Sequence, residues 1–108
     1  MDDRMNNLYS QIRELLDEPE GAPARDTVER TLTDGYAQAL ALEAERWRLE
    51  RRIGEVASML TGGNAVEKTK ELSGLAKRLS GADGDLTHLR GMLVSLRQHH
   101  ESALRAAS

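Results

Sequence analysis

Two long segments of this chain carry a heptad repeat, in which core positions recur at alternating intervals of three and four residues. In the first segment these positions are Val28, Leu32, Gly35, Ala39, Leu42, Arg46, Leu49, Ile53, Val56 and Leu60. In the second segment they are Leu72, Leu75, Leu79, Ala82, Leu86, Leu89, Leu93, Leu96, His100 and Ala103. A glycine-containing turn sequence separates the two segments. The repeat therefore predicts an all-α fold, an antiparallel coiled-coil helical hairpin.

The remaining residues are arranged around this hairpin in what we expect to be a single helical domain, residues 1–108. An apolar spacing of three and four residues predicts a short N-terminal helix. The prolines that follow it indicate a linker. The expected elements are the N-terminal helix at 1–18, the linker at 19–25, the long helix at 26–61, the turn at 62–64 and the return helix at 64–107.

Local signals support these boundaries. Residues 26–29 and 64–67 each have the pattern of a capping box, which marks the start of a helix. Gly62 and Gly63 are expected to end the long helix in left-handed geometry. Gly81 and Gly84 are only three residues apart in the return helix, so we expect a kink or a short loop near residues 80–84.

The register of the hairpin follows from centring its turn on residue 64. This places the small residue Gly35 opposite Leu93, which would let the two backbones approach closely. Arg46, the charged residue in the first seam, then lies level with the expected break. We predict that Arg46 escapes burial there and forms an ion pair with Asp83 or Asp85.

A second apolar stripe on the long helix lies outside the hairpin seam and contains Tyr36, Leu40 and Trp47, together with Ala44. The N-terminal helix could cover this stripe through its own apolar face, and that is the arrangement we expect. The alternative is a partner, either a second copy of the chain or another protein. Tyr36, Leu40 and Trp47 are accordingly the candidate partner-binding residues.

Composition excludes several classes of function. The chain has no cysteine, and no apolar run approaches the roughly 18 residues of a membrane span. Its N-terminus lacks the apolar core of a signal peptide, so we expect a cytoplasmic protein that does not contact a membrane. A net charge of −3 is unlike that of a nucleic-acid-binding protein. The arginines at 46–52 alternate with glutamates that can pair with them along the helix.

The sequence shows no catalytic constellation and no metal site. His99 and His100 are adjacent and therefore point to different helix faces, and His88 is too distant to form a metal-binding pair with either. We find no nucleophile–base pattern and no phosphate-binding glycine loop. We therefore expect a protein that is not an enzyme and that has no cofactor.

One stretch of the return helix matches a known signature in part. The signature is E-x3-S-x2-R-x3-Q-x3-D. The chain has Asp83 at the Glu position, Thr87 at the Ser position and Arg90 at the Arg position, while Val94 and Gln98 depart from it. On these residues the chain resembles the actinobacterial anti-sigma factors of the RsiG type.

The resemblance covers residues 83–98 and implies a helical hairpin that binds a sigma factor under the control of cyclic di-GMP. Asp83, Thr87 and Arg90 are the ligand-binding residues that it implies. The members of that family carry the signature on both helices, and residues 27–61 contain no second copy.

The function that we expect is therefore a non-enzymatic helical-hairpin module for protein–protein interaction, a regulator that resembles anti-sigma factors. One alternative is a structural scaffold that self-associates into a homo-oligomeric coiled coil. A further alternative is a sensor that binds cyclic di-GMP.

Overall fold

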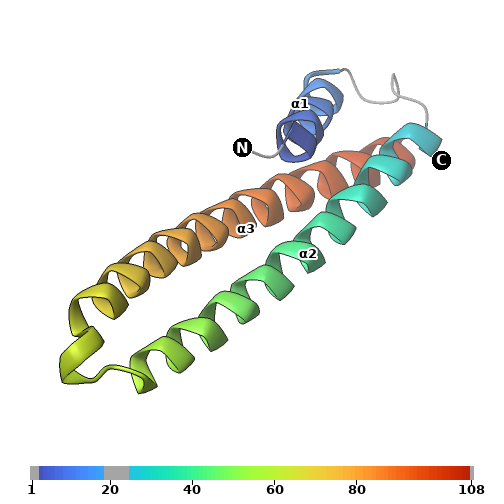
Figure 1. Cartoon of the computed structure of the whole chain (residues 1–108). Coiled ribbons are helices and arrows are strands. Elements are labelled where there is room, and N and C mark those ends of the chain that lie inside the picture. Colours follow the sequence, from blue (N-terminus) through green and yellow to red (C-terminus); the bar gives the residue numbers. More distant parts are fainter. Residues whose placement is uncertain (1–2, 19–24, 108) are drawn as a thin grey trace. The chain divides into compact units, whose positions relative to one another are not determined.

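The computed structural model describes residues 3–18 and 25–107, and every regular element within these ranges is helical. Helix α1 spans Asp3–Asp17, α2 spans Arg25–Ser58, the short 3-10 helix η1 spans Gly62–Asn64 and α3 spans Ala65–Ala107 (Figure 1). The predicted all-α fold, with a helical hairpin and a short N-terminal helix, is confirmed. Most of the expected linker, residues 19–24, lies outside the described residues.

The chain divides into two compact units. The first unit comprises Met1–Leu40 and Thr87–Ser108, and therefore contains α1, the beginning of α2 and the end of α3. The second unit, Ala41–Leu86, contains the rest of α2 and α3 with the turn between them.

The core of the second unit is formed by the predicted heptad positions. Leu49 and Val56 of α2 cluster with Leu75 and Ala82 of α3. The partly buried residues packed against this cluster are Ile53, Leu72 and Leu79. Because every one of these residues lies on a seam of the repeat, the sequence pattern alone locates the core.

The turn of the hairpin differs from our expectation. Helix α2 ends at Ser58, and the amides of Met59 and Leu60 donate to the carbonyls of Val56 and Ala57 at 3.0 and 3.3 Å. These bonds to the third preceding residue tighten the last turn and satisfy carbonyls at the helix end. The helix therefore stops before the glycines.

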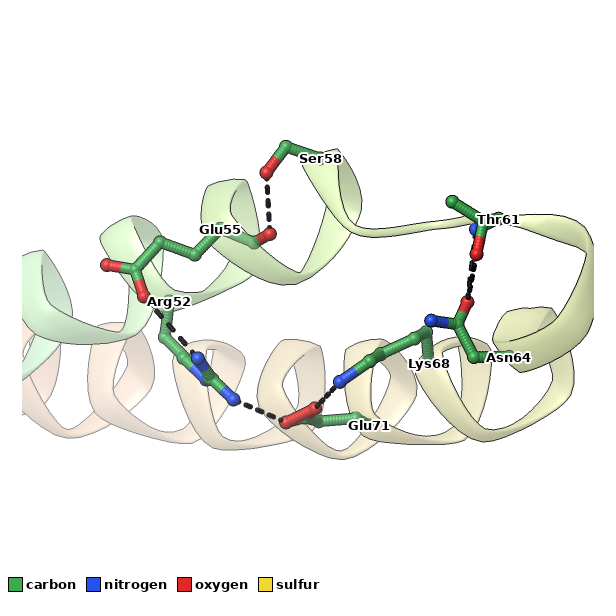
Figure 2. Close-up of polar contacts among 7 residues, drawn as sticks. All are labelled: Arg52, Glu55, Ser58, Thr61, Asn64, Lys68 and Glu71. Atoms are coloured by element: carbon green, nitrogen blue, oxygen red, sulfur yellow. Dashed lines mark hydrogen bonds and ion pairs between the residues drawn. The ribbon is translucent and has the colours of Figure 1, made fainter.

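Hydrogen bonds between Thr61 and Asn64 stabilise the start of η1, which precedes the return helix. The backbone amide and hydroxyl of Thr61 both donate to Oδ1 of Asn64, at 3.0 and 3.2 Å (Figure 2). Thr61 thus caps η1, whereas α3 begins at Ala65, directly after the Asn64 that we predicted as its cap. We expected left-handed geometry at Gly62 and Gly63, and this prediction is wrong, since neither glycine has a φ in that region.

The short loop that we expected as one possibility at residues 80–84 is wrong, because α3 is helical without a break from Ala65 to Ala107. Each glycine in a helix costs about 1 kcal/mol relative to alanine. Burying one leucine side chain contributes about 1.5–3 kcal/mol. Ala82 and Leu86 are both buried in this stretch, so keeping the seam intact outweighs the glycine cost.

The first unit buries apolar side chains from all three of its helices. Helix α1 contributes Met5, Leu8, Ile12 and Leu15, which are at most 7% exposed. Val28 and Leu32 of α2 and Leu89, Leu93 and Leu96 of α3 are buried with them. Contacts from α1 reach both other helices: Tyr9 packs edge-on against His88 at 4.9 Å between ring centroids, and a hollow between α1 and α2 is lined by Leu15 and Thr31.

The close approach predicted at Gly35 is confirmed within this unit. A Cβ atom added to Gly35 would overlap Cδ2 of Leu93 and lie 3.3 Å from its Cγ. Gly35 is buried, so the leucine occupies the space that a side chain would need. Only glycine fits at this level of the seam without movement of Leu93.

Candidate functional site

The apolar stripe of α2 is exposed. In the first unit the side chains of Tyr36 and Leu40 are 42% and 66% exposed, and in the second unit Trp47 is 58% exposed. Our expectation that the N-terminal helix covers the stripe is therefore wrong for Tyr36 and Leu40, which belong to the same unit as that helix.

The reason is the face of α2 against which α1 packs. The hollow shared by these two helices is lined by Thr27, Thr31 and Asp34 of α2. At 3.6 residues per turn, Tyr36 lies about 180° around the helix from Thr27. Helix α1 therefore covers the opposite side of α2.

Trp47 makes a cation–π contact on the surface of α2. The guanidinium carbon of Arg51, one turn later on α2, lies 4.8 Å from the centroid of the indole ring. Such cation–π contacts at exposed sites contribute roughly 0.5–1 kcal/mol. The pair lies entirely within the second unit, on the side of α2 that faces solvent.

The ion pair predicted for Arg46 is confirmed. Its Nη1 lies 3.2 Å from Oδ1 of Asp83, and its Nε lies 3.8 Å from Oε1 of Glu50. The Arg46 side chain remains 39% exposed, so the guanidinium reaches the flank of the seam. A charged residue at a seam position is tolerated because its head group stays in contact with water and acids.

Two further ion pairs cross the other flank of the second unit, and sequence reasoning missed them. Arg78 Nη2 donates to Glu45 Oε1 at 3.3 Å, and Arg52 Nη2 donates to Glu71 Oε2 at 3.1 Å (Figure 2 shows the second pair). The hydrogen bond to Glu71 raises the pKa of Arg52.

The two ion pairs have opposite arrangements of charge: the acid lies on α2 in the first pair and on α3 in the second. A slip of seven residues would place Glu45 against Glu71, or Arg52 against Arg78, depending on its direction. The pairs thus disfavour both neighbouring registers. The signal for them in the sequence is an acid and an arginine seven residues apart on each helix.

The residues implied by the anti-sigma resemblance all lie on α3. Asp83 is in the second unit, where it is paired with Arg46. Thr87 and Arg90 are in the first unit and exposed, as is Val94 of the departing signature position. The carboxylate of Asp83 is thus already engaged by a cation of the chain.

The histidines occupy two different environments in the first unit. The His100 side chain is only 12% exposed, and its Nε2 lies 3.6 Å from Glu29 Oε1. A hydrogen bond from Arg25 to the same carboxylate, at 2.9 Å, lowers the pKa of Glu29, and His100 contributes in the same direction. Nε2 of His99 is buried and has no hydrogen-bond partner among the described residues.

The hollow between α1 and α2 has a volume of about 290 Å³. Its polar lining consists of Gln11, Glu14, Glu18, Thr27, Arg30, Thr31 and Asp34. The Thr31 hydroxyl donates to the Thr27 carbonyl at 2.9 Å and is thereby occupied. Across residues 3–18 and 25–107, no group of three or more acidic or histidine residues is arranged to hold a metal ion.

Comparison of the chain with protein-family models, with curated proteins and with solved structures found no match. Within the described part of the chain, none of the helices combines the length and the apolar character that crossing a membrane requires.

Proposed function

We propose that this chain is a non-enzymatic helical-hairpin module that acts by binding another protein. The observation that carries the proposal is the exposure of large apolar side chains of α2 that neither unit uses in its own core. Leu40 in the first unit and Trp47 in the second are each more than half exposed. Tryptophan and tyrosine are enriched among residues that dominate the energy of protein interfaces.

Affinity capture from the native host tests the proposal. The full chain serves as bait beside two variants, Trp47→Ala and Val66→Ala. Val66 is a suitable control because it is a large apolar residue, 71% exposed, on a different helix. A partner that is retained by wild type and by Val66→Ala, but lost with Trp47→Ala, supports the proposal. Equal capture by all three baits contradicts a role for Trp47.

The regulatory form of the proposal rests on the resemblance of Asp83, Thr87 and Arg90 to the anti-sigma signature. It predicts that the captured partner is a sigma factor. Calorimetric titration with cyclic di-GMP tests the ligand separately, with Arg90→Ala as the comparison. No heat at high micromolar ligand would remove cyclic di-GMP from the proposal and leave protein binding in place.

The scaffold alternative makes a different prediction. A homo-oligomeric coiled coil would have at least twice the mass of the 12.0 kDa chain by light scattering after gel filtration. A monomer over a wide concentration range would contradict that alternative.

A further inference from the structure

Trp47 and Arg51 form a compact exposed pair on α2 in the second unit. The guanidinium of Arg51 lies over the indole at 4.8 Å. The ring nevertheless remains 58% exposed. Burying the rest of this surface against a partner would remove a large apolar area from water, which is the main source of association energy.

Arg51 differs from the arginines around it. Arg46 is paired with Asp83, Arg48 with Glu45, and Arg52 with Glu55 and Glu71. The stacking on Trp47 is the only interaction that Arg51 makes with the residues that the structure describes. A guanidinium carries five N–H donors in a planar fork that matches a carboxylate. The donors of Arg51 are thus available to an acid from outside the chain.

The positions on either side of the pair are small. Ala44, Trp47, Arg51 and Gly54 follow each other at intervals of three, four and three residues, so they share one exposed face of the helix. A Cβ atom added to Gly54 would have nothing within 4 Å. Small residues flanking a large one let a second helix approach closely and place its side chains around the indole.

We propose that this face, Ala44, Trp47, Arg51 and Gly54, binds an amphipathic helix of the partner that packs apolar residues on Trp47 and places a carboxylate where it accepts hydrogen bonds from Arg51. The inference rests on the proposed function and specifies the chemistry of the partner. A single carboxylate held by Arg51 fits this face better than a polyphosphate chain, because Glu43, Glu50 and Glu55 border it and repel each further charge of an extended anion.

Trp47 is the only tryptophan of the chain, so its fluorescence reports on this surface directly. The probes are two synthetic amphipathic helical peptides without tryptophan, identical except that one has glutamate and the other lysine beside its apolar stripe. The glutamate peptide is expected to shift the Trp47 emission to the blue in a saturable manner. We expect it to bind about tenfold more tightly than the lysine peptide.

Two matched variants test whether Arg51 is the arginine that binds the glutamate of the peptide. Arg51→Gln should lose about tenfold in affinity for the glutamate peptide, whereas Arg48→Gln, which removes an arginine already paired with Glu45, should change it less than about twofold. Circular dichroism is expected to show both variants equally folded, because both side chains are exposed.

The proposal is overturned if neither peptide shifts the emission, if both bind equally, or if the two variants weaken binding to the same extent. It is also overturned if a single-stranded oligonucleotide binds and the glutamate peptide does not. Should these tests fail while the host partner is still captured through Trp47, the partner class is wrong and the proposed function stands.

Discussion

Replacement of Gly35 by alanine tests the close approach of the helices in the first unit. Two effects of opposite sign compete. Removing glycine from a helix interior stabilises the fold by about 0.8–1.0 kcal/mol. The new methyl group, however, would overlap Cδ2 of Leu93 and crowd its Cγ at 3.3 Å and its Cδ1 at 3.4 Å. Leu93 is only 2% exposed and cannot turn into solvent. Overpacking of a core costs about 1–3 kcal/mol.

The expected net effect of Gly35→Ala is therefore between neutral and a destabilisation of about 2 kcal/mol. The matched control is Gly91→Ala, an exposed position of α3 in the same unit where an added Cβ meets nothing within 4 Å. That variant should stabilise the chain by about 1 kcal/mol. Urea unfolding followed by circular dichroism gives both values, and the two variants should differ by about 1–3 kcal/mol.

A double-mutant cycle assigns the difference to Leu93. Leu93→Ala alone should cost about 2–5 kcal/mol. In that background Gly35→Ala should become favourable by up to about 1 kcal/mol, because the atoms that opposed the methyl group are gone. If Gly35→Ala is as stabilising as Gly91→Ala in the wild-type background, or if the cycle shows no coupling, the argument for a required glycine is refuted.

Three further predictions concern charge and helix continuity. A cycle of Arg46→Ala and Asp83→Ala should give a coupling of about 0.2–1 kcal/mol that shrinks with added salt; a coupling of zero at low salt would contradict the ion pair. Gly81→Ala and Gly84→Ala should each raise the free energy of unfolding by up to about 1 kcal/mol and increase helicity by circular dichroism, whereas a loss of stability would mean that these residues are not helical. Because Arg25 lowers the pKa of Glu29 in the folded state, the pair stabilises the fold above the unfolded value of about 4.3 and loses this effect as the pH falls through the folded pKa. Arg25→Ala should therefore raise the pKa of Glu29 in an NMR titration, and an unchanged value would show that the contact is not formed in solution.

The candidate interaction residues were predictable only in part. The sequence identified Tyr36, Leu40 and Trp47 as lying outside the seam, since helical periodicity assigns each residue to a face. It could not tell that Tyr36 and Leu40 stay exposed, because that depends on which face of α2 receives α1 within the first unit. It also did not show that Arg51 lacks a carboxylate partner, since the glutamates nearby offer several pairings of similar energy.

The errors at the turn and at residues 80–84 have different causes. Gly81 and Gly84 predicted a local break in the return helix, but propensity is a weak preference that packing overrides. In α3 the burial of Ala82 and Leu86 keeps the helix continuous. At the turn, α2 already ends at Ser58, and the hydrogen bonds between Thr61 and Asn64 form η1 without left-handed geometry at the glycines.

The sequence by itself determined the hairpin, its seams and its register, down to the close approach of Gly35 to Leu93 and the pairing of Arg46 with either Asp83 or Asp85, of which the structure selects Asp83. These follow from a repeat whose period matches the helix and from one turn that joins the two segments, so geometry leaves few alternatives. Only the tertiary structure decided where α1 packs, and so which side chains of α2 remain exposed within the first unit. The packing site of α1 depends on the sum of many contacts between residues distant in sequence, and the periodicity of a single helix does not predict that sum.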